Sequence, residues 1–157
     1  MRSAKPAFIW IISILKKRKI PFQISGGMAA RVWGAKRELA DIDINVDLEN
    51  FDEILPEVKK FVIFGPGKYK DKNWDLYEMT LRYRGQEIDI CRASDQKIFN
   101  KNTKKWESLR IDFSTSRNKK VFGLPVSVMP KDELIDYKIK LRRPVDLKDT
   151  GGVDPHT

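Results

Sequence analysis

The stretch "ISGGMAARVWGAKRELADIDINVD", from Ile24 to Asp47, joins a Gly-Gly turn to a segment that carries several carboxylates. Its end, DIDINVD, alternates strictly between polar and apolar residues, which predicts a β-strand. The apolar residues would face the core, and Asp41, Asp43, Asn45 and Asp47 would share the other face. Like charges on one strand face repel each other, so this arrangement indicates a function.

Binding of divalent cations would explain the paired carboxylates. Asp41 and Asp43 are two residues apart on a strand, so their side chains leave the same face. Mg²⁺ prefers carboxylate and phosphate oxygens, and two such ions about 3.5–4 Å apart can activate a hydroxyl and stabilise a leaving pyrophosphate. A third ligand would come from EIDIC, where Asp89 lies between two isoleucines and Glu87 on the same face is the competing candidate. The two strands would have to lie side by side.

The glycines Gly26 and Gly27 lie between a short predicted strand and a predicted helix. Such a turn lets backbone amides approach phosphate oxygens, and the start of the following helix favours negative charge. Ser25 adds a hydroxyl at the same place. Lys36 and Arg37, just ahead of the acidic strand, are placed to contact a triphosphate, and bidentate geometry favours Arg37.

The composition limits the class of protein. The 157 residues, of which 41% are hydrophobic, fit one domain with a real core. The net charge of +9 favours a polyanionic partner such as a nucleotide or nucleic acid. A small cationic antibiotic would favour an acidic pocket, which this net charge does not indicate. The tryptophans are mostly expected in the core, but Trp106 lies among lysines and is a candidate for base stacking.

Several kinds of site and location are disfavoured. The single cysteine, Cys91, forms no internal disulfide and is predicted to be a small buried side chain. The only histidine, His156, lies next to the end of the chain, which leaves almost nothing for a catalytic triad or a His-rich zinc site. The apolar run AFIWIISIL (7–15) is followed by KKRK without a small-residue cleavage site, so it predicts a buried helix. We expect a cytoplasmic protein without a membrane partner.

The periodicity of the whole chain predicts a single α/β domain, residues 1–149, with a mixed sheet flanked by helices. The expected helices are 5–19, 28–33, 49–61 and 130–143; the expected strands are 22–25, 41–47, a hairpin over 74–91 that turns near residues 84–85, and a strand-like stretch at 119–129. The segment from residue 62 to 73 is predicted to contain a loop. Residues 94–118 are not assigned, apart from a candidate strand at 109–114, and residues 150–157 are predicted to be a polar tail.

The order of these features resembles the nucleotidyltransferase superfamily related to DNA polymerase beta. SGG and a short helix are followed by GAKRELADIDI and later by EIDI. The chain looks most like the small stand-alone members, which include toxin and abortive-infection components. The resemblance implies that Gly26 and Gly27 hold the nucleotide phosphates, that Asp41 and Asp43 bind both metal ions, and that Asp89 completes the site and helps to activate the acceptor hydroxyl.

The resemblance also assigns basic residues. Many small members carry an arginine four residues before the first aspartate with a threonine between them; Arg37 matches, whereas Leu39 stands at the threonine position. Small members often carry a lysine in their last helix, near DYKIKLRRPVDLKD in this chain. Lys138 is the candidate phosphate contact, Lys140 is the next choice, and Arg142 and Asp146 belong to the same region.

The function implied by the resemblance is transfer of a nucleoside monophosphate from an NTP to an acceptor hydroxyl, with release of pyrophosphate. Two Mg²⁺ ions are expected, with Mn²⁺ as the alternative. The basic surface favours an RNA acceptor such as tRNA, and a protein hydroxyl and a small aminoglycoside-like molecule are the alternatives. A helical partner protein that covers the nucleotide is also expected. The competing hypothesis is a non-catalytic module of the same fold that binds RNA or a partner protein.

Overall fold

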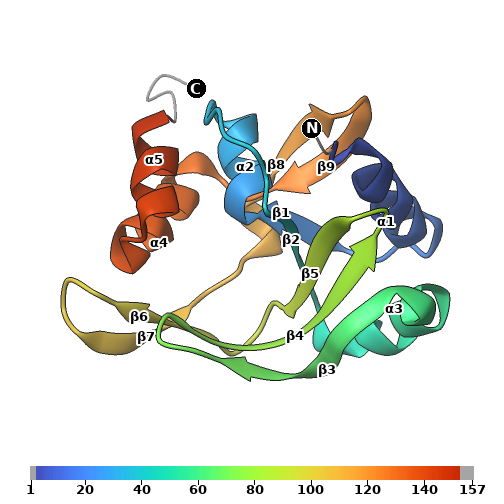
Figure 1. Ribbon diagram of the computed structural model, residues 1–157, viewed down its shortest axis with the longest axis horizontal. Coiled ribbons are helices and arrows are strands. Elements are labelled where there is room, and N and C mark those ends of the chain that lie inside the picture. The colour runs from blue at the N-terminus through green and yellow to red at the C-terminus, as the bar shows by residue number, and fades with distance from the viewer. Residues whose placement is uncertain (1–2, 153–157) are drawn as a thin grey trace.

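The chain folds around one curved, mixed β-sheet, shown in the computed structural model of Figure 1, which describes residues 3–152. Within these residues the sheet has nine strands: β1 (Phe22–Ser25), β2 (Asp41–Val46), β3 (Val62–Lys70), β4 (Trp74–Tyr83), β5 (Gln86–Arg92), β6 (Gln96–Asn100), β7 (Lys105–Leu109), β8 (Arg117–Val121) and β9 (Leu124–Val128). The helices are α1 (Lys5–Lys17), α2 (Gly26–Val32), α3 (Phe51–Val58), α4 (Lys131–Leu141) and α5 (Pro144–Gly152), with short 3₁₀ turns η1 (Leu48–Asn50), η2 (Lys59–Phe61) and η3 (Phe113–Thr115).

The strand order of the sheet is β7-β6-β4-β5-β2-β1-β9-β8, and β3 pairs with β4 outside this path. The central strand β2 runs antiparallel to β1 and parallel to β5, and β1 runs parallel to β9. Strands of both directions therefore occur in one sheet. The mixed α/β architecture predicted from the sequence is confirmed.

The core lies between the apolar face of the central strands and the first helix. Ile42, Ile44 and Val46 of β2 are completely buried, as the alternating pattern predicted. The apolar run of α1 packs against the same core, with Phe8 and Leu15 fully buried. Figure 1 shows α1 and α3 at one side of the molecule and α4 and α5 at the opposite side. Among the described residues, no helix combines the length and apolar character needed to cross a membrane.

The segment 62–73, predicted to contain a loop, forms the long strand β3 and its turn into β4. The two strands pair antiparallel, with register shifts on either side of Phe64. Gly65 and Pro66 lie within this irregular part, and a strand at a sheet edge tolerates both residue types. The predicted loop is confined to residues 71–73, and the strand β3 was missed because its pairing depends on β4 and not on an apolar pattern within β3 itself.

The unassigned region 94–118 contains the hairpin β6–β7, the turn η3 and the start of β8. The candidate strand at 109–114 is wrong: β7 ends at Leu109, and the Asp112 carboxylate accepts a hydrogen bond from the amide of Ser114 at the start of η3. A short Asp-Ser turn competes with strand formation at this point. The strand-like stretch at 119–129 covers most of the antiparallel hairpin β8–β9, including the turn between its two strands.

The C-terminal part of the chain contains a helix that the sequence reading did not identify. Helix α4 ends at Leu141, and Arg142 adopts a left-handed conformation with φ 50°. Helix α5 then begins at Pro144, because proline suits the first turn of a helix. The predicted tail therefore starts inside α5. His156 and the other residues after 152 lie outside the described part of the chain.

Candidate active site

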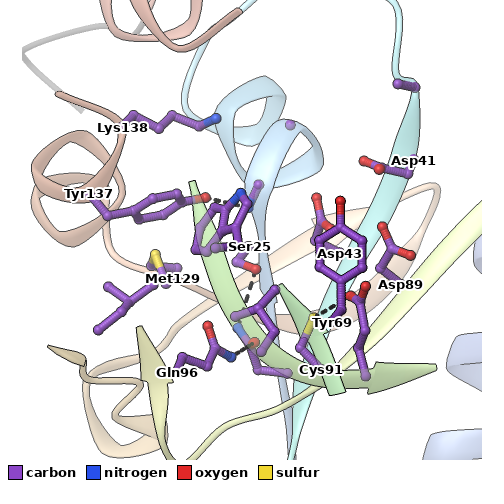
Figure 2. Close-up of a pocket in the computed structure, with 18 of the residues that line it drawn as sticks. Ser25, Asp41, Asp43, Tyr69, Asp89, Cys91, Gln96, Met129, Tyr137 and Lys138 are labelled. Carbon is purple, nitrogen blue, oxygen red and sulfur yellow. Dashed lines mark hydrogen bonds between the residues drawn. The ribbon is translucent and has the colours of Figure 1, made fainter. Parts of the chain in front are cut away.

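Asp41, Asp43 and Asp89 come together on the polar face of the sheet (Figure 2). β2 and β5 are parallel neighbours in which Asp43 is the register partner of Asp89, so alternation on both strands puts the side chains on one face. One carboxylate oxygen of each residue lies within 4.8 Å of the others. We call these three residues the aspartate cluster. Glu87, the competing candidate, forms a hydrogen bond with Arg82 at 2.8 Å instead.

Burial and repulsion raise the pKa of two carboxyl groups in the aspartate cluster. Burial, together with the charges of Asp41 and Asp89, raises the pKa of Asp43 well above its usual range. Burial also raises the pKa of Asp89 to about 8, against the hydrogen bond from Thr80, which lowers this pKa. Thr80 Oγ1 donates that bond to Asp89 Oδ1 at 2.6 Å. Close carboxylates that resist ionisation favour a bound cation, and an all-oxygen donor set suits a hard divalent ion.

The turn between β1 and α2 packs directly against the aspartate cluster. Gly26 has a φ of +62°, and a Cβ at this position would lie 2.0 Å from Asp43 Oδ2, so only glycine fits. A Cβ on Gly27 would lie 2.6 Å from Arg37 Nη2. The Gly26 amide, predicted to face phosphate, donates to the Tyr137 hydroxyl at 2.9 Å instead. Close packing on Asp43 and Arg37 therefore accounts for both glycines.

Ser25 belongs to a buried series of hydrogen-bonded side chains next to the glycine turn. Asn45 Nδ2 donates to Ser25 Oγ at 3.2 Å, and Gln96 Nε2 donates to Asn45 Oδ1 at 2.7 Å. Asn45 follows the aspartates on the polar face of β2, as predicted, whereas the region of Gln96 was unassigned. These hydrogen bonds, which Figure 2 shows as dashed lines, orient the Ser25 side chain.

Buried ion pairs connect α5 to both of the predicted phosphate contacts. Asp149 accepts two hydrogen bonds from Arg37, Nε to Oδ1 at 2.5 Å and Nη2 to Oδ2 at 2.9 Å. Lys138 Nζ lies 2.9 Å from Asp149 Oδ2 and 3.2 Å from Asp146 Oδ1. Arg143 Nε donates to Asp146 Oδ2 at 2.6 Å. We call these five residues the α5 ion network. Asp149 and Arg143 were not predicted, although the spacing of the aspartates in VDLKD is that of one helix face.

Two other basic residues named from the sequence lie elsewhere. Lys140 was the second choice for a phosphate contact. Its Nζ lies 3.2 Å from Glu107 Oε1 and 3.1 Å from Asp136 Oδ2, and it does not line the cavity over the aspartate cluster. Lys36 is exposed and also lies outside the lining of that cavity. The side chains alternate along the loop before β2, so Arg37 points to the site while Lys36 points to solvent.

A cavity of about 410 Å³ lies over the aspartate cluster. Lys138, Arg37 and Tyr137 line it together with the cluster and the glycine turn. Figure 2 shows Lys138 and Tyr137 on one side of this space and the three aspartates on the other.

Further acidic groups line the same cavity. Asp71 accepts a hydrogen bond from the Tyr69 hydroxyl at 2.8 Å, and Glu78 accepts one from the Cys91 thiol at 3.4 Å. Burial raises the pKa of Glu78. Cys91 is buried as predicted, but it lines the cavity and not the apolar core. The cavity lining thus holds more acidic than basic side chains although the whole chain is basic, because most of the lysines, unlike Lys138, lie on the outer surface. Net charge is therefore a poor guide to this pocket.

Solved structures match the fold over nearly the whole chain. A protein from Thermotoga maritima assigned as a nucleotidyltransferase shares 20% sequence identity at a TM-score of 0.69, over 91% of this chain and 89% of its own. The lincosamide antibiotic adenylyltransferase LnuA, solved with lincomycin, shares 15% identity at a TM-score of 0.65, over 99% and 98%. The protein ANT(2″)-Ia, solved with adenylyl-2″-tobramycin, shares 17% identity at a TM-score of 0.60, over 95% and 87%.

No protein-family model matches the sequence, and no curated protein matches it. The structural likeness alone shows that the chain has the nucleotidyltransferase fold. This confirms the fold that the sequence resemblance implied.

Proposed function

We propose that this protein is an enzyme that transfers a nucleoside monophosphate from an NTP to an acceptor hydroxyl and releases pyrophosphate. The observation that carries the proposal is the aspartate cluster, whose three carboxylate oxygens lie within 4.8 Å of one another in the cavity. The fold supports it, because two of the similar structures are an adenylyltransferase and a protein solved with an adenylylated compound.

Asp41, Asp43 and Asp89 are the proposed ligands of two Mg²⁺ ions, with Mn²⁺ as the alternative. Carboxylate oxygens are ligands that Mg²⁺ prefers together with phosphate oxygens, so the aspartate cluster would hold such ions beside the nucleotide phosphates. Bound divalent ions supply positive charge that stabilises the transferring phosphate and the leaving pyrophosphate. Asp89, oriented by Thr80, accepts the proton of the acceptor hydroxyl.

The nucleotide phosphates are proposed to lie between the glycine turn and the α5 ion network. Arg37 and Lys138 supply positive charge on this wall of the cavity, and Ser25 supplies a hydroxyl. Gly26 and Gly27 allow the turn to approach both Asp43 and Arg37 without a side chain in between. The triphosphate would then bridge from these cations to the metal ligands across the cavity.

An RNA such as tRNA is the proposed acceptor, with a protein hydroxyl as the alternative. Lys70, Asp75 and Lys97 are register partners across three strands and therefore share one face of the sheet. Lys70 Nζ lies 5.2 Å from the ring centre of Trp106, which is 40% exposed. Among residues 3–152, Figure 1 shows no helix on the side of β6 and β7 opposite to α4. Exposed cations beside an exposed aromatic ring suit a single strand of nucleic acid.

A helical partner protein is also proposed. Helix α5 exposes Val145 by 41% and Leu147 by 55%, and Val145 lines the cavity. Exposed apolar side chains at the edge of a site favour contact with another protein surface. A helix packed on α5 would narrow the cavity around a bound nucleotide.

A second candidate acceptor is a small cationic molecule that carries a hydroxyl group. Asp71 and Glu78 favour it, because they add negative charge to the cavity beyond the aspartate cluster. Lincomycin and adenylyl-2″-tobramycin are bound in two of the similar structures. A cationic acceptor would lie against these carboxylates in the cavity.

Incubation with each α-labelled NTP and Mg²⁺ tests the function directly. Separate reactions offer total RNA, total protein or small aminoglycosides as the acceptor. Each is carried out with the wild type, with Asp41→Ala/Asp43→Ala, and with Asp52→Ala/Glu53→Ala as a control at exposed residues. Label transfer by the wild type and the control, but not by Asp41→Ala/Asp43→Ala, supports the proposed enzymatic activity. Transfer that survives Asp41→Ala/Asp43→Ala contradicts the catalytic assignment. RNA binding that weakens steeply with salt and never leads to transfer favours a non-catalytic module.

The RNA surface has its own test. Lys70→Ala/Trp106→Ala is expected to weaken RNA binding and to leave nucleotide binding unchanged. Lys119→Ala is the matched control, because Lys119 also lies over a tryptophan, 4.7 Å from the ring centre of Trp33, on another part of the chain. Equal loss of RNA binding in both variants would contradict a specific surface on β3, β6 and β7.

A further inference from the structure

Asp149 joins two cations that come from distant parts of the chain. Its carboxylate accepts two hydrogen bonds from Arg37, in the segment between α2 and β2, and lies 2.9 Å from Lys138 Nζ of α4. Asp149 itself belongs to α5, and its side chain is completely buried. One carboxylate therefore fixes the positions of Arg37 and Lys138 relative to each other.

The α5 ion network carries more positive than negative charge. Among the described residues, the side chains of Arg37, Lys138 and Arg143 face the two carboxylates of Asp146 and Asp149, which leaves one positive charge without a counter-charge in the network. Lys138 is only 2% exposed, so bulk water screens this charge weakly. A partly buried surplus of positive charge favours an anion nearby.

Both cations have more donors than these contacts use. A lysine has three N–H donors, and the described contacts of Lys138 direct two of them to Asp146 and Asp149. An arginine has five, of which Arg37 directs two to Asp149 and one to the Glu38 carbonyl. Lys138 and Arg37 both line the cavity. The wall that faces the aspartate cluster thus carries side chains with more donors than these contacts use.

A purely structural role does not explain this composition. Desolvation of buried ion pairs cancels much of their attraction, and apolar residues of the same volume often hold helices together as well. The network also acts on the site: burial raises the pKa of Asp43, and the charge of Lys138 counteracts that rise. The cations therefore lie near enough to the aspartate cluster to influence its charge.

We propose that Asp149 is a positioning residue that holds Arg37 and Lys138 as a fixed pair of donors for the nucleotide phosphates. The inference rests on the proposed function, because it assumes that the cavity binds an NTP. It makes α5 part of the nucleotide site, although α5 contributes no direct phosphate contact of its own. Loss of the Asp149 charge should therefore affect binding of phosphates and leave binding of the nucleoside unchanged.

The experiment measures the affinity of Asp149→Asn for a non-hydrolysable NTP analogue with Mg²⁺ and for the matching nucleoside. We expect affinity for the analogue to fall about tenfold and affinity for the nucleoside to change by less than about twofold. Asp136→Asn is the matched control, because Asp136 pairs with Lys140 on α4 away from the cavity. Circular dichroism checks that each variant folds. Arg37→Lys tests the same geometry if Asp149→Asn does not fold, because it keeps the charge and loses the bidentate bond.

The outcomes separate this inference from the proposed function. Suppose that the wild type binds the analogue. If Asp149→Asn binds it with the same affinity, or loses affinity equally for the analogue and the nucleoside, the positioning role is overturned and the proposed function is intact. A wild type that binds the analogue but transfers nothing contradicts the activity, while the comparison of affinities still decides the role of Asp149. A wild type that binds no nucleotide overturns both.

Discussion

Asp43 and Asp89 are register partners in the parallel ladder of β2 and β5, and their carboxylates leave the same face of the sheet. The next pair along the ladder, Ile44 and Ile90, is completely buried on the opposite face. A slip of one residue would turn the carboxylates into the core and the isoleucines into the cavity. Burial of the isoleucines therefore holds the aspartates in place.

Asp43→Asn is expected to abolish transfer and to leave the metal-free protein at least as stable as the wild type. The substitution removes a proposed metal ligand, so the rate should fall by about 100-fold or more. It also removes a buried carboxyl that its neighbours repel. Label transfer and urea unfolding in EDTA measure the two effects. Asp47→Asn, the next carboxylate of the run, is the control. A large loss of stability with normal transfer would contradict the site.

The stability of the metal-free protein is expected to fall as pH rises from about 4 to about 8. Asp89 has an ordinary pKa of 3.8 and a pKa of about 8 in the folded protein. Between these values the folded state binds more protons than the unfolded state, so the free energy of unfolding decreases with pH. Mg²⁺ should oppose this loss, because it binds the deprotonated carboxylates. Urea unfolding from pH 5 to 8, with EDTA or Mg²⁺, measures both trends, and a profile in EDTA that rises with pH would contradict them.

Gly26→Ala is expected to reduce transfer strongly, whereas Gly85→Ala should leave it unchanged. Both glycines have positive φ, so each substitution should cost about 1–2 kcal/mol of stability through backbone strain. Only at Gly26 would the new Cβ meet the Asp43 carboxylate, 2.0 Å from Oδ2, while nothing lies within 4 Å at Gly85. Transfer rates and thermal unfolding of the two variants separate strain from displacement of Asp43. Equal activity in both variants would show that the close approach has no role.

The centre of the site could be predicted because its signals are local. Alternation in DIDINVD and in EIDI identifies both strands and the face that carries Asp41, Asp43 and Asp89. The position of Thr80 could be predicted as well. Counting residues along both strands from the turn at residues 84–85 places Thr80 opposite Asp89. The sequence reading predicted the hairpin but did not use its register.

The other wall of the cavity could not be predicted from local patterns. The contact between Arg37 and Asp149 joins residues far apart in the chain, and it depends on how α5 packs beside α2. The same is true of the Gly26 amide, whose partner Tyr137 lies on α4. The acidic lining of the cavity was also missed, because net charge averages over a basic outer surface. Tertiary packing, and not periodicity, decides these features.

Thr80→Val is expected to move the pH dependence of transfer to higher pH. Burial raises the pKa of Asp89, and the hydrogen bond from Thr80 Oγ1 lowers it. Valine keeps the shape of threonine and removes the donor, so the pKa of Asp89 should rise further. Metal binding and proton acceptance both need the deprotonated carboxylate. Transfer near neutral pH should therefore decrease and recover at alkaline pH. Thr80→Ser keeps the donor and should restore the wild-type profile. A Thr80→Val rate that is reduced equally at every pH would mean that Thr80 only packs against β5 and does not control the charge of Asp89.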